Sequence, residues 1–199
     1  MYDWMKKYPW LWAPDDIDGD GSEKYCTIEC LPDGWIKAFG EEMCKEIDKE
    51  IKRSKLDDMY VVQAKEKYGE LVIFFSHHTP AINDILRKYE EISTHVCDRC
   101  GRPDVNMINL NHWLSVYCEE CYEKHLRRGG KLYKDVVVGE AKMPDKIYWR
   151  RYSKNGDEHF EMDISETTRK IRERYAERKA NGEFDRQDNF DGDENYYGA

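Results

Sequence analysis

The sequence lacks any long apolar run. None of its hydrophobic stretches approaches the roughly 18 residues that a membrane-spanning helix needs. The stretch MYDWMKKYPWLW at 1–12 also lacks the uninterrupted apolar segment and the small-residue cleavage site of a secretory signal peptide. We therefore expect a cytoplasmic protein without membrane contact.

A surplus of positive charge is missing as well. The 199 residues include 32 Lys and Arg against 41 Asp and Glu, which gives a formal net charge of -9. Nucleic-acid binders usually present a basic surface that releases condensed counterions, so this balance disfavours broad phosphate contact without excluding a local basic patch. Hydrophobic residues at 40% and aromatic residues at 13% are too frequent for a wholly disordered chain, and the length allows a real core.

The seven cysteines do not indicate a disulfide framework. Their count is odd, no secretion signal is visible, and four of them form two C-x-x-C pairs, CDRC at 97–100 and CEEC at 118–121. Each pair can place two sulfurs along one edge of a tetrahedron, and the spacer allows a hairpin that brings both pairs to one ion. We predict one structural Zn²⁺, bound by four thiolates: Cys97, Cys100, Cys118 and Cys121.

Alternatives to this ligand set stay open. A histidine close in sequence, His95, His112 or His125, could replace one cysteine, or the thiols could be redox-active or unligated. Four protein ligands leave no open coordination position, so we do not expect catalysis by the metal. The other cysteines, which cannot complete a second four-sulfur site, are expected to be free thiols: Cys26, Cys30 and Cys44.

Two motifs imitate functional sites but lack their determinants. A ββα-metal nuclease needs a histidine base after the first cysteine pair and usually another histidine after the last cysteine, where this chain has GRPDVNM and YEKH. Asp16, Asp18 and Asp20 resemble the opening of an EF-hand loop. Thr27 stands where that loop needs a bidentate Glu, so we expect a solvated acidic loop and leave calcium binding open.

Hydrophobic periodicity predicts a small α+β lobe before the cysteine pairs. Apolar residues at three- and four-residue steps predict a helix over 34–53. Segments 59–64 and 71–76, rich in β-branched and aromatic residues, predict a β-hairpin. The pair Thr79-Pro80 places a cap and a proline in the order that favours the start of a second helix.

The region after the cysteine pairs predicts a second hairpin and a last helix. If Asn155-Gly156 is the turn, Arg150 lies opposite Glu161. This register puts the apolar residues of both strands on one face: Ile147, Trp149, Phe160, Met162 and Ile164. Ser165 can cap a basic helix that ends near Gly182.

This basic helix could lie along nucleic acid or an acidic partner, although charge-rich helices are most often solvated. The cations that we predict to contact a partner are Arg169, Lys170, Arg174 and Arg178.

These patterns divide the chain into five parts. They are an aromatic and acidic N-terminal arm (1–32), the α+β lobe (33–94), a zinc ribbon (95–129), a β-hairpin plus basic helix (130–182) and an acidic tail expected to be disordered (183–199). The fold class is α+β, with two helices on a short antiparallel hairpin sheet, then the four-cysteine zinc ribbon, a second β-hairpin and a C-terminal helix. We expect the aromatic residues of the arm to pack on its own domain.

Several motifs resemble a family of small zinc-ribbon proteins encoded by bacteriophages and prophages. They are DGW at 33–35, KEKYGEL at 65–71, STHVCDRCGRP at 93–103 and W-x4-C-x2-C at 113–121. The resemblance covers the region 30–128 and implies a phage accessory protein without a settled activity, acting in the bacterial cytoplasm. It assigns a role only to the four metal-binding cysteines, so a special function of this chain would reside outside the shared region.

Two functions from different classes follow. The first is a non-catalytic protein that binds a host protein, for example to inhibit a bacterial antiviral defence nuclease, because acidic residues gather at both ends of an acidic chain. The second is a nucleic-acid-binding regulator that uses the zinc ribbon, Arg127, Arg128, Lys131 and the basic helix. We do not expect an enzyme, because no nucleophile-base pair, phosphate loop or open metal site can be assembled from the sequence.

Overall fold

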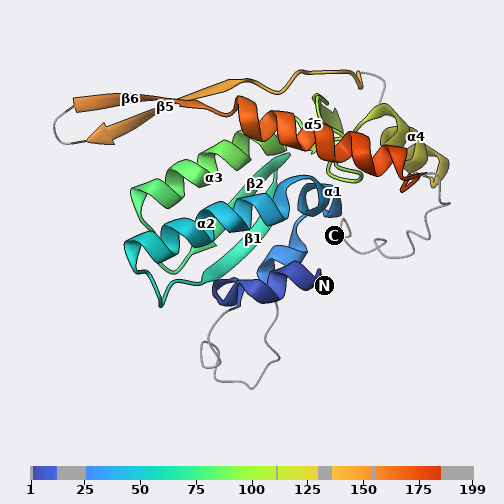
Figure 1. Cartoon of the computed structure of the whole chain (residues 1–199). Coiled ribbons are helices and arrows are strands. Elements are labelled where there is room, and N and C mark those ends of the chain that lie inside the picture. Colours follow the sequence, from blue (N-terminus) through green and yellow to red (C-terminus); the bar gives the residue numbers. More distant parts are fainter. Residues whose placement is uncertain (1, 13–25, 111, 130–135, 154–155, 185–199) are drawn as a thin grey trace.

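The computed structural model describes residues 2–12, 26–110, 112–129, 136–153 and 156–184. Within these residues the fold is α+β, with helices and three separate two-stranded antiparallel sheets (Figure 1). No helix in this part of the chain combines the length and the apolar character needed to cross a membrane. The predictions for Asp16, Asp18, Asp20, Lys131 and the tail from 185 onward lie outside the described residues.

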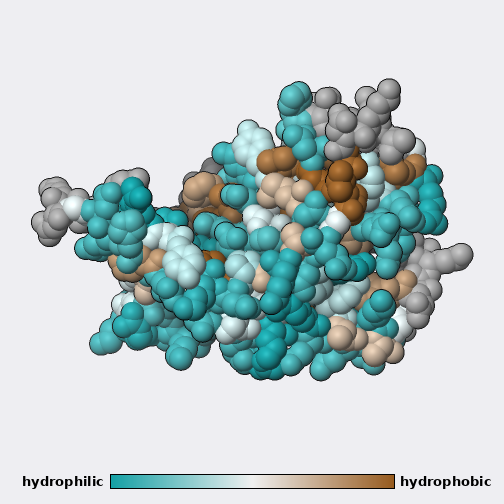
Figure 2. All heavy atoms as spheres, turned by 90° about the horizontal axis from the view of Figure 1, so that it is seen from above, coloured by the Kyte–Doolittle hydropathy of each residue, from teal (hydrophilic) through white to brown (hydrophobic). Residues whose placement is uncertain are grey.

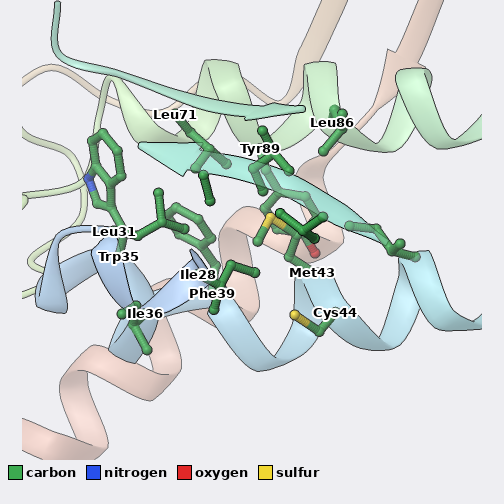
Figure 3. Close-up of a cluster of buried hydrophobic side chains, with 14 of the residues drawn as sticks. Ile28, Leu31, Trp35, Ile36, Phe39, Met43, Cys44, Leu71, Leu86 and Tyr89 are labelled. Carbon is green, nitrogen blue, oxygen red and sulfur yellow. The ribbon is translucent and has the colours of Figure 1, made fainter. Parts of the chain in front are cut away.

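The first hairpin and two long helices form the middle of the main hydrophobic core. The elements are β1 (Val61–Lys67), β2 (Glu70–Phe75), α2 (Glu41–Ser54) and α3 (Pro80–Ser93). β1 pairs with β2, and α3 packs on both α2 and β2. The side chains of Phe39, Leu71 and Tyr89 meet between these elements, with the Phe39 and Tyr89 rings stacked at 5.5 Å (Figure 3). Thr79 caps α3 by accepting a hydrogen bond from the Ile82 amide, as predicted.

The helix predicted over 34–53 is one helical run with a wider turn inside it. α1 (Asp33–Trp35) leads into a π-helical turn, η4 (Ile36–Gly40), which continues into α2. Such turns are rare and occur mostly as single insertions in α-helices. Both Trp35 and Phe39 are buried, so the wider turn lies where the helical run enters the core.

The N-terminal arm packs against this lobe. It forms short 3₁₀ turns, η1 (Asp3–Lys7), η2 (Pro9–Leu11) and η3 (Thr27–Cys30). Trp10 is buried, its ring lies 6.1 Å from that of Phe75, and its indole nitrogen donates a hydrogen bond to Asp48. The expectation that aromatic residues of the arm pack on its own domain is therefore confirmed for Tyr8 and Trp10, which both join the main core.

The second hairpin and the last helix lie across one side of the lobe (Figure 1). They are β5 (Lys146–Ser153), β6 (Gly156–Asp163) and α5 (Ser165–Ala180). Seen from above, this side is mostly hydrophilic, and the β5–β6 hairpin projects from the rest of the molecule (Figure 2). Thr168 and Ile171 are the buried residues of α5, and Ile171 belongs to the main hydrophobic core.

The register of the second hairpin differs from the prediction by two residues. Arg150 lies opposite His159 and not opposite Glu161, which instead forms an ion pair with Lys146. An offset of two residues leaves every side chain on its predicted face, so Trp149 and Phe160 still stack, with ring centroids 5.4 Å apart. The predicted cap of the last helix also changes, because Asp163 accepts the hydrogen bond from the Ser165 amide, at 2.9 Å.

Candidate metal centre

Four cysteine sulfurs meet beside the lobe. The Sγ atoms of Cys97, Cys100, Cys118 and Cys121 all lie within 4.8 Å of one another. Zinc–sulfur bonds of about 2.3 Å in a tetrahedral site would put the sulfurs about 3.8 Å apart. The cluster is compact enough to close around such an ion, and Cys100 Sγ lies 3.6 Å from Cys118 Sγ. These four cysteines can therefore hold a metal ion, as the two C-x-x-C pairs predict.

The alternative ligands do not join this cluster. His95, His112 and His125 are not members of the group, and no second group of three or more ligand residues comes as close among the described residues. His95 instead places Nδ1 3.2 Å from the carbonyl oxygen of Ala141.

The two cysteine pairs are positioned by different elements. Cys97 and Cys100 follow α3 in a turn that ends with Gly101 at φ 77°. Cys118 and Cys121 lie at the start of α4 (Glu119–Arg127). Between them, β3 (Met107–Leu110) pairs with β4 (Trp113–Val116), which is the hairpin that the spacer length predicts.

Hydrogen bonds tie the two pairs to each other. The Cys118 amide lies 3.4 Å from Cys97 Sγ, and the Asp98 amide donates to the Val116 carbonyl at 2.8 Å. Burial raises the pKa of Cys97 well above its ordinary value, whereas hydrogen bonds from Cys100, Cys121 and Cys97 lower the pKa of Cys118. A buried group of four sulfurs cannot hold four negative charges without a cation, so metal binding would release protons.

The first pair is in direct contact with α1 through backbone atoms. The Gly34 amide donates to the Asp98 carbonyl at 2.9 Å, and a Cβ on Gly34 would lie 2.3 Å from the Cys97 carbonyl oxygen. A Cβ on Gly101 would lie 2.6 Å from the Gly34 carbonyl oxygen. Trp35 adds a bond from its indole nitrogen to the Val96 carbonyl at 2.8 Å. Gly34, in DGW, and Gly101, after CDRC, thus belong to one close backbone contact. The sequence does not reveal this contact, because the two glycines are far apart in it.

Asp98 lies between two ligand residues and is almost completely buried, with 4% of its surface exposed. Its Oδ1 has no hydrogen-bond partner among the described residues, although Arg99 Nε is 3.7 Å away. Burial raises the pKa of Asp98 to about 8. No sequence signal indicates this burial, because an acid between two cysteines normally lies on the surface of such a turn.

Two arginines of α5 donate hydrogen bonds to backbone carbonyls, one in this turn and one in η4. Arg178 donates from Nη1 to the Cys100 carbonyl at 3.2 Å, and its other nitrogens bind Glu183. Arg174 donates to the Ala38 carbonyl in η4. Thus two of the four cations that we predict to contact a partner reach inward to backbone carbonyls.

The other two cations form ion pairs nearer the surface. Arg169 pairs with Glu166 and Glu173, and Lys170 pairs with Glu42 and Glu166. A role of any of the four in partner contact stays a prediction.

Comparison of this chain with family models, curated proteins and solved structures finds no match. The resemblance to phage zinc-ribbon proteins therefore depends on the sequence motifs alone and stays a prediction.

Proposed function

We propose that this chain is a non-catalytic binding protein whose fold is held together by one structural Zn²⁺. The observation that carries the proposal is the cluster of four sulfurs within 4.8 Å of one another. Tetrahedral sites with four thiolates bind zinc or iron, and paired C-x-x-C motifs joined by a short hairpin are typical of structural zinc. Four protein ligands would leave no position for substrate or water, so the metal would not act as a catalyst.

The surroundings of the cluster support a structural role. Backbone atoms of Gly34 contact the first cysteine pair on one side, and the guanidinium of Arg178 contacts it on another. The metal would therefore fix the end of α3, the start of α4 and the packing of α1 and α5 at the same point. A rigid frame of this kind suits a protein that presents surfaces to a partner.

The partner that we propose is a host protein, with a bacterial antiviral nuclease as the specific case. The net charge of -9 supports this choice, because an acidic surface can occupy a site made for nucleic acid. The alternative, a nucleic-acid-binding regulator, has less support. Arg174 and Arg178 bind backbone carbonyls of their own chain, which removes two cations from the surface that would face phosphates.

Metal analysis of freshly reduced protein tests the structural part of this proposal. We expect one zinc ion per chain and a colourless protein, whereas a coloured protein with bound iron, or folded protein without metal, would contradict it.

Affinity capture from bacterial lysate, combined with gel-shift assays, tests the binding part. We expect a stoichiometric protein partner and no shift of DNA or RNA at low ionic strength. A shift that weakens steeply with salt would favour the nucleic-acid alternative.

A further inference from the structure

A cleft away from the cysteines separates the side of α3 from the edge of β5. Its volume is about 170 Å³, and its polar lining includes Glu70, Glu90, Glu91 and Arg87. At about 30 Å³ for each water molecule, this space holds five or six waters, well below the about 300–1,000 Å³ of small-molecule pockets. The cleft therefore has the size for one inserted side chain and not for a cofactor.

One wall of the cleft is the open edge of a strand. Tyr148 and Trp149 are consecutive residues of β5, so their side chains point to opposite faces of the sheet, yet both line the cleft. The cleft must therefore run along the backbone edge of β5. In the described residues β5 pairs only with β6, so its other edge has no strand partner there, and Tyr148 is 70% exposed.

The charge of the cleft is negative. Three carboxylates, from Glu70, Glu90 and Glu91, and one guanidinium, from Arg87, belong to its lining, and Glu91 Oε1 also lies 3.6 Å from His95 Nε2. Burial raises the pKa of Glu90, and although Arg87 opposes this effect, the neighbouring Glu70 adds to it. A cation placed between these carboxylates would relieve both the burial of charge and the repulsion between like charges.

Two residues that line the cleft each have a buried hydrogen-bond donor without a partner in the described part of the chain. Arg87 Nε and Trp149 Nε1 are shielded from solvent and have no hydrogen-bond partner among the described residues. Buried donors in folded proteins nearly always find acceptors, and a ligand with acceptor atoms would satisfy these two if their side chains turn toward the cleft. A peptide that carries a basic side chain supplies both the cation and backbone carbonyl acceptors.

We propose that this cleft binds a lysine or arginine side chain carried by an extended segment of a partner protein, which lies along the open edge of β5. The carboxylates would bind the cationic group, and the segment that carries it would lie along the backbone of Tyr148 and Trp149. Addition of a strand to an open sheet edge supplies main-chain hydrogen bonds, and the adjacent pocket selects the side chain. This inference rests on the proposed protein-binding function and names the chemistry of the partner segment.

The test uses a defined probe, the blocked peptide acetyl-Thr-Val-Lys-Val-Thr-amide, titrated into the full chain. The indole N–H resonance of Trp149 reports binding at the cleft, and calorimetry gives the affinity. The matched peptide with norleucine in place of lysine keeps the stem and removes the charge. We expect the lysine peptide to shift the Trp149 resonance and to bind about tenfold or more tightly than the norleucine peptide.

Variants of the protein provide the second arm. Glu90→Gln and Glu70→Gln each remove a carboxylate with little change in volume and should weaken the lysine peptide severalfold. Glu123→Gln removes a carboxylate from α4, outside the cleft, and should leave the affinity unchanged. Trp149→Phe keeps an aromatic ring beside Phe160 but loses the N–H donor, so it should weaken both peptides by a similar factor.

Equal affinity for the two peptides would overturn the proposed charge recognition. An unchanged Trp149 resonance at millimolar peptide would overturn the site itself, because the cleft would then hold only solvent.

Zinc is measured on the same samples, because none of the cleft residues is a proposed metal ligand. If the protein contains no zinc but still binds the lysine peptide, the proposed structural metal is contradicted and this inference is not. If the protein contains zinc but does not bind the peptide, this inference is contradicted. The proposed protein-binding function is not, since a protein partner could use another surface.

Discussion

Arg172 and Asp104 form a two-pronged ion pair between α5 and the turn that follows the first cysteine pair. Arg172 Nε lies 2.8 Å from Asp104 Oδ2, and Nη2 lies 2.8 Å from Oδ1. Asp104 adopts a left-handed backbone conformation, with φ 59°, and also accepts a hydrogen bond from the Met143 amide. One carboxylate thus joins the cysteine turn, the segment before β5 and the last helix.

A double-mutant cycle should show that this pair is coupled. Arg172→Gln and Asp104→Asn each remove one partner, and asparagine tolerates the left-handed conformation, so backbone strain does not enter. Both side chains are about 30% exposed, and a two-pronged, charge-assisted pair of this kind should give a coupling free energy of about 1–3 kcal/mol. Urea unfolding of the four proteins measures it. The exposed pair Arg169 and Glu166 is the control, and equal coupling in both cycles would contradict the prediction.

The same carboxylate should make stability depend on pH. Burial acts to raise the pKa of Asp104, but hydrogen bonds from Arg172 and the Met143 amide outweigh it, so the pKa lies below its ordinary value. A carboxyl with a lower pKa in the folded state contributes its full stability above the unfolded-state pKa, and the contribution is lost as pH falls through the folded-state value. The difference in unfolding free energy between wild type and Asp104→Asn should therefore shrink from about pH 6 to about pH 3. A difference that grows on acidification would contradict this assignment.

Alanine at Gly34 should destabilise the protein and weaken metal binding together. The added Cβ would meet backbone atoms of Cys97 and Asp98, which cannot move without shifting a metal ligand. We expect the free energy of unfolding to fall by at least about 1–3 kcal/mol, and the metal to be lost to a chelator faster than from the wild type. Gly40→Ala is the matched control on the same helical run, because its Cβ would meet the Trp4 ring at an ordinary 3.4 Å. Equal effects of the two substitutions would show that the contact with Cys97 is not a constraint.

Removal of the metal should destabilise the whole chain and not only the cysteine region. The turn that carries Cys97 and Cys100 contacts α1 and α5. If loss of the metal disorders this turn, both helices lose these contacts. We expect Cys118→Ser, or a strong chelator, to lower the thermal midpoint by about 10–20 °C. Cys30→Ser, at an exposed cysteine outside the cluster, should leave both zinc content and midpoint unchanged. A metal-free protein with an unchanged midpoint would argue against a structural role.

Features set by neighbouring residues could be predicted from the sequence. The cysteine pairs and the cap at Thr79 each depend on side chains within a few positions of one another. The faces of the β5–β6 hairpin were also predictable, because alternation of apolar residues fixes them. Its register was not, since a shift by two residues leaves the same side chains facing the core.

Features that depend on distant segments could not be read in this way. The contact of Gly34 with Cys97, the burial of Asp98 and the π turn before α2 all arise where separate parts of the chain meet. The arginines of α5 illustrate the same limit. Their spacing resembles a solvated basic face, yet Arg174 and Arg178 bind carbonyls more than seventy positions away, which no local pattern encodes.

The turn that carries Cys97 and Cys100 is contacted by Gly34, from far earlier in the sequence, and by Arg178, from far later in it. A synthetic peptide cut to 95–129 would keep all four ligand cysteines but lose the contacts with Gly34 and Arg178. It would exchange its ion faster and hold it in a looser geometry, so metal affinities measured on such a fragment would underestimate those of the intact protein.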